Sequence, residues 1–333
     1  MLVPILLLIF GLALLWIGAD FVIESAKKLA QKFRLSHVFI GLTVVSIGTS
    51  LPEIFTSIYS SISNISGVHA SGIGVGINIG ASIGQITLVV GLVAFLGTLH
   101  TRKKTLMRDG TVVLLSILAV FIMGMSGFIS RLEGIILIIA YAVYLIILSR
   151  DERNDRRQSP LIAEPVDAIE LKSRKLRYHP VMVSLILLGG VGLLAIGSSL
   201  VVKNAIKISD AFNLTQSFVG VIILGVGGFL PELSTALKGI TKKAHEISLG
   251  TLIGSNITDP LLSIGLGAAI SGFTFNRIHL MFDLPFWALS VLIVMLLLRK
   301  NMRIEHHERS EGAVLIGLYF LFILMKIVFF RHG

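Results

Sequence analysis

The sequence contains no cysteine and few charged residues. Without cysteine, the 333-residue chain forms neither a disulfide framework nor a thiolate metal site. Charged residues make up only 14% of the chain, and hydrophobic residues make up 54%, with a mean hydropathy of +0.88. Soluble domains carry roughly a quarter charged residues. The composition therefore excludes an ordinary soluble protein and indicates an integral membrane protein.

Signatures of catalysis are also missing. None of the nine histidines lies in the middle of an apolar run, and no HExxH motif occurs. No serine–histidine pairing suggests itself either. We therefore expect neither an enzyme nor a bound cofactor.

Apolar runs of about 20 residues, the length of a membrane-spanning helix, recur along the whole chain. They lack the alternation of outer-membrane strands, so the sequence predicts an all-α integral membrane protein and not a β-barrel. The first run has no basic leader and no clear cleavage site, so we expect it to remain as a helix. We predict ten spans, near residues 2–25, 37–63, 70–97, 106–126, 130–149, 180–203, 216–239, 246–273, 283–299 and 311–330.

The positive charge is confined to a few loops. The net charge of +10 comes largely from short loops near 27–34, 102–104, 238–243 and 299–303. The positive-inside rule makes these loops cytoplasmic and places both termini outside. The expected partner of this charge is the lipid bilayer of the cell membrane, not nucleic acid. Residues 151–178 hold 13 charges in 28 positions and predict a cytoplasmic linker, with a regulatory or lipid-contacting helix as the alternative.

The chain contains an internal repeat. Shifted by 179 positions, HVFIGLTVVSIGTSLPEIFTSI at 37–58 overlies QSFVGVIILGVGGFLPELSTAL at 216–237, and the two Pro-Glu pairs coincide. Glycines 76 and 80 correspond to glycines 250 and 254 after a five-residue gap. Five helices in each copy would make the second copy enter the membrane from the opposite side, which is typical of secondary transporters.

This repeat divides the chain into two predicted domains. Residues 1–150 would form the first five-helix repeat, with its alpha-1 motif at 41–91. Residues 151–178 would form the linker, and residues 179–333 the second five-helix repeat, with its alpha-2 motif at 220–270.

The two Pro-Glu pairs indicate an ion site. A proline inside a helix leaves the carbonyl four residues earlier without a partner, and for these prolines the carbonyls belong to Gly48 and Gly227. Free carbonyls and carboxylates are both costly in lipid unless they face a polar cavity or a partner. A bound cation satisfies both groups, so Glu53 and Glu232 are the principal candidate ligands.

Neighbouring oxygens extend this set. Thr49 and Ser50 precede Glu53 by one helical turn, and Ser255 lies four residues before Asp259, which is followed by a further proline. Such hard oxygen ligands suit calcium, sodium or magnesium and do not suit copper or zinc. For any single hydroxyl, a bond to its own helix is the competing interpretation.

Other residues in the spans are expected to be structural. Gly72, Gly76, Gly80 and Gly84 recur at i+4 spacing, which predicts close helix packing and not a nucleotide-binding loop. Asp283 lies near the end of a predicted span, where snorkelling to the interface would suffice for its charge.

At these motifs the sequence resembles the cation/calcium antiporter superfamily, and most closely the prokaryotic sodium/calcium exchangers. GTSLPE at 48–53, GFLPE at 228–232 and GSNITDP at 254–260 stand where that family has its two alpha repeats. The resemblance covers nearly the whole chain. It implies ten helices in two inverted repeats, a central cluster of four ion sites, alternating access by sliding of the first and sixth helices, and calcium extrusion driven by sodium entry.

The resemblance also supplies half of the candidate ligands. It assigns Thr49, Ser50, Glu53, Glu232, Ser255 and Asp259, and we add Ser46, Gly48, Gln85, Gly225, Gly227 and Gly228.

Four positions depart from the family pattern, namely Ala81, Gln85, Gly228 and Phe229. The resemblance implies that the divalent site, built on the two glutamates, is largely kept but loses a hydroxyl at Gly228, and that the flanking sodium sites lose side-chain ligands at Ala81 and Phe229.

Several alternatives stay open at this point. The same fold coupled to protons or another monovalent ion is the nearest one, since carboxylates carry protons as readily as cations. A passive cation channel is a more distant one, because the repeat and the proline-broken helices favour a transporter. The oligomeric state is undetermined, and a monomer would suffice.

Overall fold

The computed structural model describes residues 2–32, 46–96, 103–158, 180–241, 245–301 and 308–330. Most of the predicted linker 151–178 and the start of the predicted span 37–63 lie outside these residues. The helices in chain order are α1 (Leu2–Lys32), α3 (Ser46–Thr49), α4 (Leu51–Ile65), α5 (Ser71–Gly84), α6 (Val90–Leu96), α7 (Lys103–Gly124), α8 (Arg131–Gln158), α10 (Pro180–Phe212), α11 (Gln216–Phe218), α12 (Gly225–Gly228), α13 (Leu230–Thr241), α14 (His245–Thr258), α15 (Ile264–Ser271), α16 (Leu284–Asn301) and α17 (Glu308–Phe329).

Four wider, π-helical segments interrupt this series, namely η2 (Gln85–Val89), η3 (Val219–Leu224), η4 (Asp259–Ser263) and η5 (His279–Asp283). Two short strands, β1 (Phe128–Ile129) and β2 (Phe273–Thr274), pair antiparallel. The protein is therefore almost entirely helical, as its apolar runs predict.

Eight helices among the described residues are long and apolar enough to cross a membrane. They comprise Leu2–Ala26, Ser71–Leu96, Leu106–Gly124, Arg131–Asp151, Val181–Phe212, Gln216–Ser234, His279–Leu298 and Arg309–Phe329. The other two predicted spans, 37–63 and 246–273, are represented by broken segments. The first is described only as α3 and α4, and the second consists of α14, η4 and α15.

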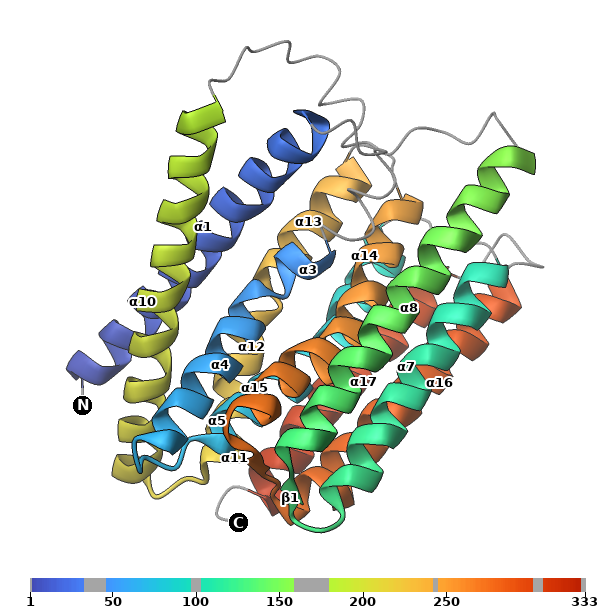
Figure 1. The fold of residues 1–333 in the computed structure, drawn as a ribbon. Coiled ribbons are helices and arrows are strands. Elements are labelled where there is room, and N and C mark those ends of the chain that lie inside the picture. The colour runs from blue at the N-terminus through green and yellow to red at the C-terminus, as the bar shows by residue number, and fades with distance from the viewer. Residues whose placement is uncertain are drawn as a thin grey trace.

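The helices form a broad bundle in which α1 and α10 lie together along one side (Figure 1). Their close approach depends on glycines: a Cβ on Gly11 would lie 3.0 Å from the Gly197 carbonyl oxygen, and one on Gly18 would lie 2.9 Å from that of Gly190. Small residues at such a crossing let two backbones pack tightly in lipid. On the other side of the bundle, α7 packs against α16, and α6 packs against α17.

The predicted glycine ladder packs α5 against the centre of the second half. A Cβ on Gly76 would lie 2.9 Å from the Gly220 Cα, and one on Gly80 would overlap the Val221 carbonyl. The ladder therefore brings the backbones of α5 and η3 into direct contact, and this contact joins the two halves of the chain.

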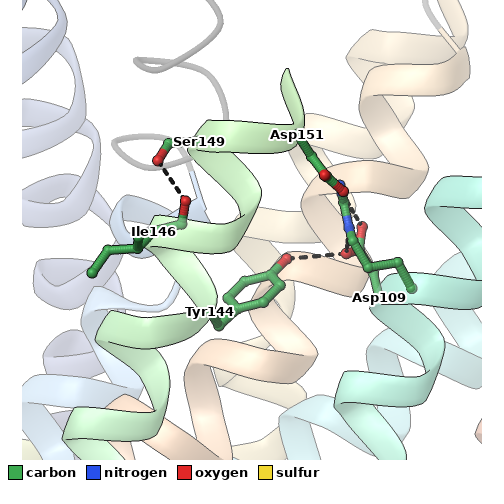
Figure 2. A network of polar contacts seen from close by, with 6 residues as sticks. Asp109, Tyr144, Ile146, Ser149 and Asp151 are labelled. Atoms are coloured by element: carbon green, nitrogen blue, oxygen red, sulfur yellow. Dashed lines mark hydrogen bonds and ion pairs between the residues drawn. The ribbon is translucent and has the colours of Figure 1, made fainter. Parts of the chain in front are cut away.

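A polar network joins α7 to α8 near one end of the bundle (Figure 2). Arg108 Nε donates to Asp109 Oδ1 at 2.7 Å, and its Nη1 donates to Asp151 Oδ2 at 3.0 Å. The Tyr144 hydroxyl approaches Asp109 Oδ1 at 3.5 Å. Each charge in this network thus faces a group of opposite sign or a donor.

A second polar network joins η5 to α17. Lys326 Nζ donates to both carboxylate oxygens of Asp283 at 2.7 Å, and His279 Nδ1 lies 2.7 Å from Asp283 Oδ2. All three side chains are buried. The expectation that Asp283 snorkels to the interface is therefore wrong, because its charge is balanced inside the protein by a lysine that lies 43 positions later.

Candidate ion-binding site

The two Pro-Glu motifs lie at matching breaks in the helices. Ser50 separates α3 from α4 with φ −82° and ψ 7°, and Phe229 separates α12 from α13 with φ −84° and ψ 2°. Each glutamate then falls in the first turn of the following helix. The positive end of a helix dipole favours an anionic side chain at this position.

Three carboxylates are buried without adequate partners. Glu53 and Asp259 are fully buried, and Glu232 is 1% exposed. Among the described residues, neither oxygen of Glu53, neither oxygen of Glu232, nor Asp259 Oδ1 has a hydrogen-bond partner. The three groups are close enough to repel one another electrostatically. Such groups are strongly destabilising unless a cation or proton compensates them.

Hydroxyl groups line one part of this cluster. Thr49 Oγ1 lies 3.2 Å from Ser255 Oγ, and both hydroxyls lie beside Glu232. Ser82 Oγ donates to Asp259 Oδ2 at 2.7 Å, and the fully buried Ser50 hydroxyl lies beside the same carboxylate. The predicted ligands Thr49, Ser50, Ser255 and Asp259 are thus brought together from α3, the break between α3 and α4, α14 and η4.

The remaining candidate oxygens have other contacts. The Gly225 carbonyl accepts from the Phe229 amide at 3.2 Å, and the Ser46 carbonyl accepts from Thr49 Oγ1 at 3.2 Å. Gly227 lies against Leu12, and Gly48 lies against Ile23, so the backbone on both sides of the cluster packs on α1. These contacts are with the residues' own helix turns and with α1, so the role of these four residues as ion ligands stays a prediction.

The positions that depart from the family pattern gather at the other part of the cluster. A Cβ on Gly228 would lie 2.5 Å from Glu53 Oε1 and 3.1 Å from Ala81 Cβ. The Phe229 ring lies over Gly84, where any Cβ would overlap it, and meets the Tyr319 ring edge-on with 6.0 Å between centroids. Phe229 is 2% exposed. An aromatic ring therefore fills the volume beside this part of the cluster.

Gln85 differs from its expected role as a ligand. Its Oε1 accepts a hydrogen bond from Asn256 Nδ2 at 2.8 Å, and its Nε2 has no partner among the described residues. Asn256 in turn accepts from Trp287 Nε1 at 2.9 Å. In this structure the Gln85 side-chain oxygen is therefore occupied by a hydrogen bond, and the side-chain nitrogen is the atom without a partner in the described part of the chain.

Sequence reasoning missed several polar residues beside the site. Asn78 Nδ2 donates to Ser57 Oγ at 2.8 Å, and Ser57 Oγ lies 3.1 Å from Ser263 Oγ. Tyr141 and Thr258 pair through their hydroxyls at 3.0 Å. A signal for α4 was present in the sequence, because Thr56, Ser57, Ser60, Ser61 and Asn64 follow Glu53 at helical spacing on one face.

The described part of the chain holds no group of three or more His, Cys, Asp and Glu side chains that could bind a metal ion on their own. A cation at the cluster would therefore take part of its coordination from hydroxyl and backbone oxygens, a mixed set that suits calcium and sodium.

A comparison with protein families decides what kind of protein this is. The family model described as "Sodium/calcium exchanger protein" matches residues 3–150 and again residues 182–328. The chain belongs to the sodium/calcium exchanger family.

Individual relatives agree with this family assignment. An uncharacterised membrane protein of Methanocaldococcus jannaschii is 31% identical over 322 residues, covering 95% of each chain. The sodium/calcium exchanger MaX1 of Methanosarcina acetivorans is 27% identical, covering 97% of this chain and 98% of its own. A solved structure of the sodium-calcium exchanger NCX_Mj, soaked with Na⁺ and Sr²⁺, superposes with a TM-score of 0.61 and 27% identity, and 99% of both chains is covered.

Membership in the sodium/calcium exchanger family makes this chain a multi-pass membrane protein and a cation/calcium antiporter. The family consists of exchangers, so the chain is a transporter and not an enzyme, and any ions it moves are substrates and not cofactors.

Proposed function

We propose that this exchanger moves calcium across the membrane in exchange for sodium, by alternating access, with the ions bound near the midplane around Glu53 and Glu232. The observation that carries the proposal is the set of three buried carboxylates, Glu53, Glu232 and Asp259, of which five oxygens have no hydrogen-bond partner among the described residues. A divalent ion offers two charges to this set, which removes the repulsion between the glutamates and replaces the missing hydrogen bonds.

The chemistry of the cluster favours hard cations. Carboxylate, hydroxyl and carbonyl oxygens suit calcium and sodium, and no thiolate or imidazole approaches the three carboxylates among the described residues. A monovalent ion would need fewer charged ligands than a divalent ion. The Asp259 end of the cluster supplies such a set, with one carboxylate and the hydroxyls of Ser50 and Ser82. Binding of one divalent or of several monovalent ions to overlapping oxygens would make the two substrates compete, as antiport requires.

Two inverted five-helix repeats, residues 1–150 and 179–333, are the architecture we propose for this cycle. In support, the family model matches each half separately. The π-helical segments Gln85–Val89 and Asp259–Ser263 lie 174 positions apart, the same shift that aligns the glycines of the two halves. Under this shift α6 corresponds to α15 and α8 corresponds to α17. The contact between α6 and α17 is then equivalent to the contact between α15 and α8.

The buried aspartates support inversion of the second repeat. Asp109 and Asp283 are also 174 positions apart. Because β1 follows α7 and pairs with β2, which precedes α16, the end of α7 and the start of α16 lie at the same side of the bundle. Asp109 lies near the start of α7, so the two aspartates lie at opposite ends. From the positions of the basic loops we expect both termini to lie outside and residues 151–178 to lie in the cytoplasm.

Transport by purified protein in proteoliposomes tests the function. Calcium uptake should follow an imposed sodium gradient more strongly than a potassium or proton gradient. Uptake driven by protons alone would assign the same fold to proton/calcium exchange, and calcium leakage without any counter-gradient would indicate a channel. Glu53→Gln and Glu232→Gln should each nearly abolish uptake, because loss of one charge in a low-dielectric site weakens ion binding by several kcal/mol.

A matched control is available on α1. Glu24 is 58% exposed and pairs with Lys28 at 2.7 Å, so Glu24→Gln removes a carboxylate without touching the cluster. This variant should transport calcium as the unmodified protein does. Normal uptake in Glu53→Gln or Glu232→Gln would refute the assignment of the site.

The part of the cluster formed by Gly228 and Phe229 should weaken the coupling of transport to sodium. Gly228 and Phe229 stand at the repeat positions of Thr49 and Ser50, and neither offers a side-chain oxygen. We expect lower sodium cooperativity than in an exchanger with hydroxyls in both halves. The double variant Gly228→Thr, Phe229→Ser should raise the Hill coefficient for sodium. No gain in this variant, together with high cooperativity in the unmodified protein, would contradict the expectation.

A further inference from the structure

A chain of three buried side chains joins α16, α14 and η2. Trp287 Nε1 donates to Asn256 Oδ1 at 2.9 Å, and Asn256 Nδ2 donates to Gln85 Oε1 at 2.8 Å. All three residues are fully buried. The chain ends at Gln85 Nε2, which has no hydrogen-bond partner among the described residues.

The first member of this chain fixes the direction of the others. An indole N–H can only donate, whereas an amide side chain can turn either its oxygen or its nitrogen toward a neighbour. Trp287 therefore holds the Asn256 oxygen on its own side and directs the Asn256 nitrogen toward Gln85. The Leu252 carbonyl, 3.1 Å from Asn256 Nδ2, favours the same orientation. Gln85 must then present its oxygen to Asn256 and its nitrogen to the opposite side.

The other half of the molecule makes the same contact with different groups. Gln85 and Asp259 each begin a π-helical segment, and they lie 174 positions apart, as Ser82 and Asn256 do. Ser82 donates to Asp259 Oδ2 at 2.7 Å, as Asn256 donates to Gln85. Within the segments that the structure describes, the group without a hydrogen-bond partner is the anionic oxygen Asp259 Oδ1 in one half and the N–H₂ group of Gln85 in the other.

These leftover atoms have opposite preferences for a ligand. A carboxylate oxygen attracts a cation, and an amide nitrogen carries hydrogens that repel it. The segment η2, which begins with Gln85, packs against α13, which carries Glu232. Ala81 and Gly228 add no side-chain oxygen at this end. The Gln85 end of the cluster is therefore built to face a carboxylate and not a cation.

We propose that Trp287 is a positioning residue for ion selectivity. By fixing Asn256 it holds the Gln85 nitrogen toward the cluster, closes that end to a monovalent cation, and so restricts the number of sodium ions that compete with one calcium ion. The proposal rests on the proposed function, because it assumes that the cluster binds these ions. Loss of the indole donor leaves the Leu252 carbonyl as the remaining contact that orients Asn256, which weakens the preference of both amides and allows the Gln85 oxygen to turn into the cluster as a new cation ligand.

Displacement of bound ⁴⁵Ca²⁺ by Na⁺ from the purified, detergent-solubilised full chain tests this role. Trp287→Phe keeps the aromatic volume but removes the donor, and should lower the half-displacing sodium concentration by about 2- to 10-fold, the equivalent of one net hydrogen bond, or raise its Hill coefficient. Gln85→Glu should also strengthen displacement, because it supplies an oxygen in either orientation. In the Gln85→Glu background, Trp287→Phe should add nothing. Trp16→Phe, at a residue that is 41% exposed on α1, is the matched control and should leave displacement unchanged.

The orientation of the chain has a readout that does not depend on ion binding. The protein has two tryptophans, so an indole ¹⁵N–¹H spectrum should contain two signals. Asn256→Leu should shift the signal that disappears in Trp287→Phe and leave the Trp16 signal in place. Absence of this shift would overturn the hydrogen-bonded chain itself.

The outcomes separate the inference from the proposed function. If the unmodified protein binds calcium and sodium displaces it, but Trp287→Phe and Trp16→Phe behave alike, the positioning role is wrong. Should Trp287→Phe not fold, an unchanged sodium response in Gln85→Glu would refute the role equally well. Failure of the unmodified protein to bind calcium would refute the proposed function, while the indole spectrum would still decide whether Trp287 orients Asn256.

Discussion

The contact between Phe229 and Gly84 gives a quantitative prediction. The Phe229 ring is buried, lies where a Gly84 side chain would be, and packs edge-on against Tyr319. Phe229→Ser removes about 100 Å³ of side chain, and a cavity of that size costs about 2.4 kcal/mol at about 24 cal/mol per Å³. Loss of the aromatic pair adds about 0.5–1.5 kcal/mol. We therefore expect Phe229→Ser to lower the free energy of unfolding by about 3–4 kcal/mol.

A second substitution makes this prediction specific. Gly84→Leu alone should also destabilise the protein, because its side chain would collide with the ring. In the double variant the leucine fills the space that the ring leaves, so the two losses should not add, and the double variant should be more stable than either single one. Equilibrium unfolding by SDS in mixed micelles measures the three free energies. If the losses in free energy of unfolding of the two single variants simply add in the double variant, the two residues do not share one space. That result would refute the view that the Phe229 ring fills the volume over Gly84.

Three further predictions concern the scaffold. Lys326→Met should destabilise the protein by about 3–5 kcal/mol, since it removes the lysine cation that balances the buried Asp283 carboxylate, and adding Asp283→Asn should recover part of the loss in the same unfolding assay. Gly80→Ala should reduce the yield of folded protein on size-exclusion chromatography, whereas Gly189→Ala, where no atom lies within 4 Å of the added Cβ, should not. Residues 151–178 should be cleaved by protease from the cytoplasmic side only, and their shortening should leave calcium uptake intact; cleavage from the outside would overturn the proposed topology.

Much of the site could be predicted from the sequence because its signals are local. A Pro-Glu pair inside an apolar run implies a freed carbonyl and a buried charge wherever the rest of the chain lies. The same pair recurring at a constant shift indicates a repeat without any knowledge of packing. The glycines at i+4 spacing likewise predict a close helix contact, although they do not identify η3 as the partner.

What the sequence alone determined is the class of protein and the acidic residues of its candidate site, because hydropathy, proline and charge act through the chain's own backbone and through the lipid around it. The orientation of Gln85, the ring of Phe229 over Gly84, and the balance of Asp283 by Lys326 were decided only by the tertiary structure. Each of these depends on which side chain arrives from a distant helix. An amide can donate or accept, a phenyl ring can pack in several directions, and an aspartate can be exposed or paired, so only the neighbour selects among these states.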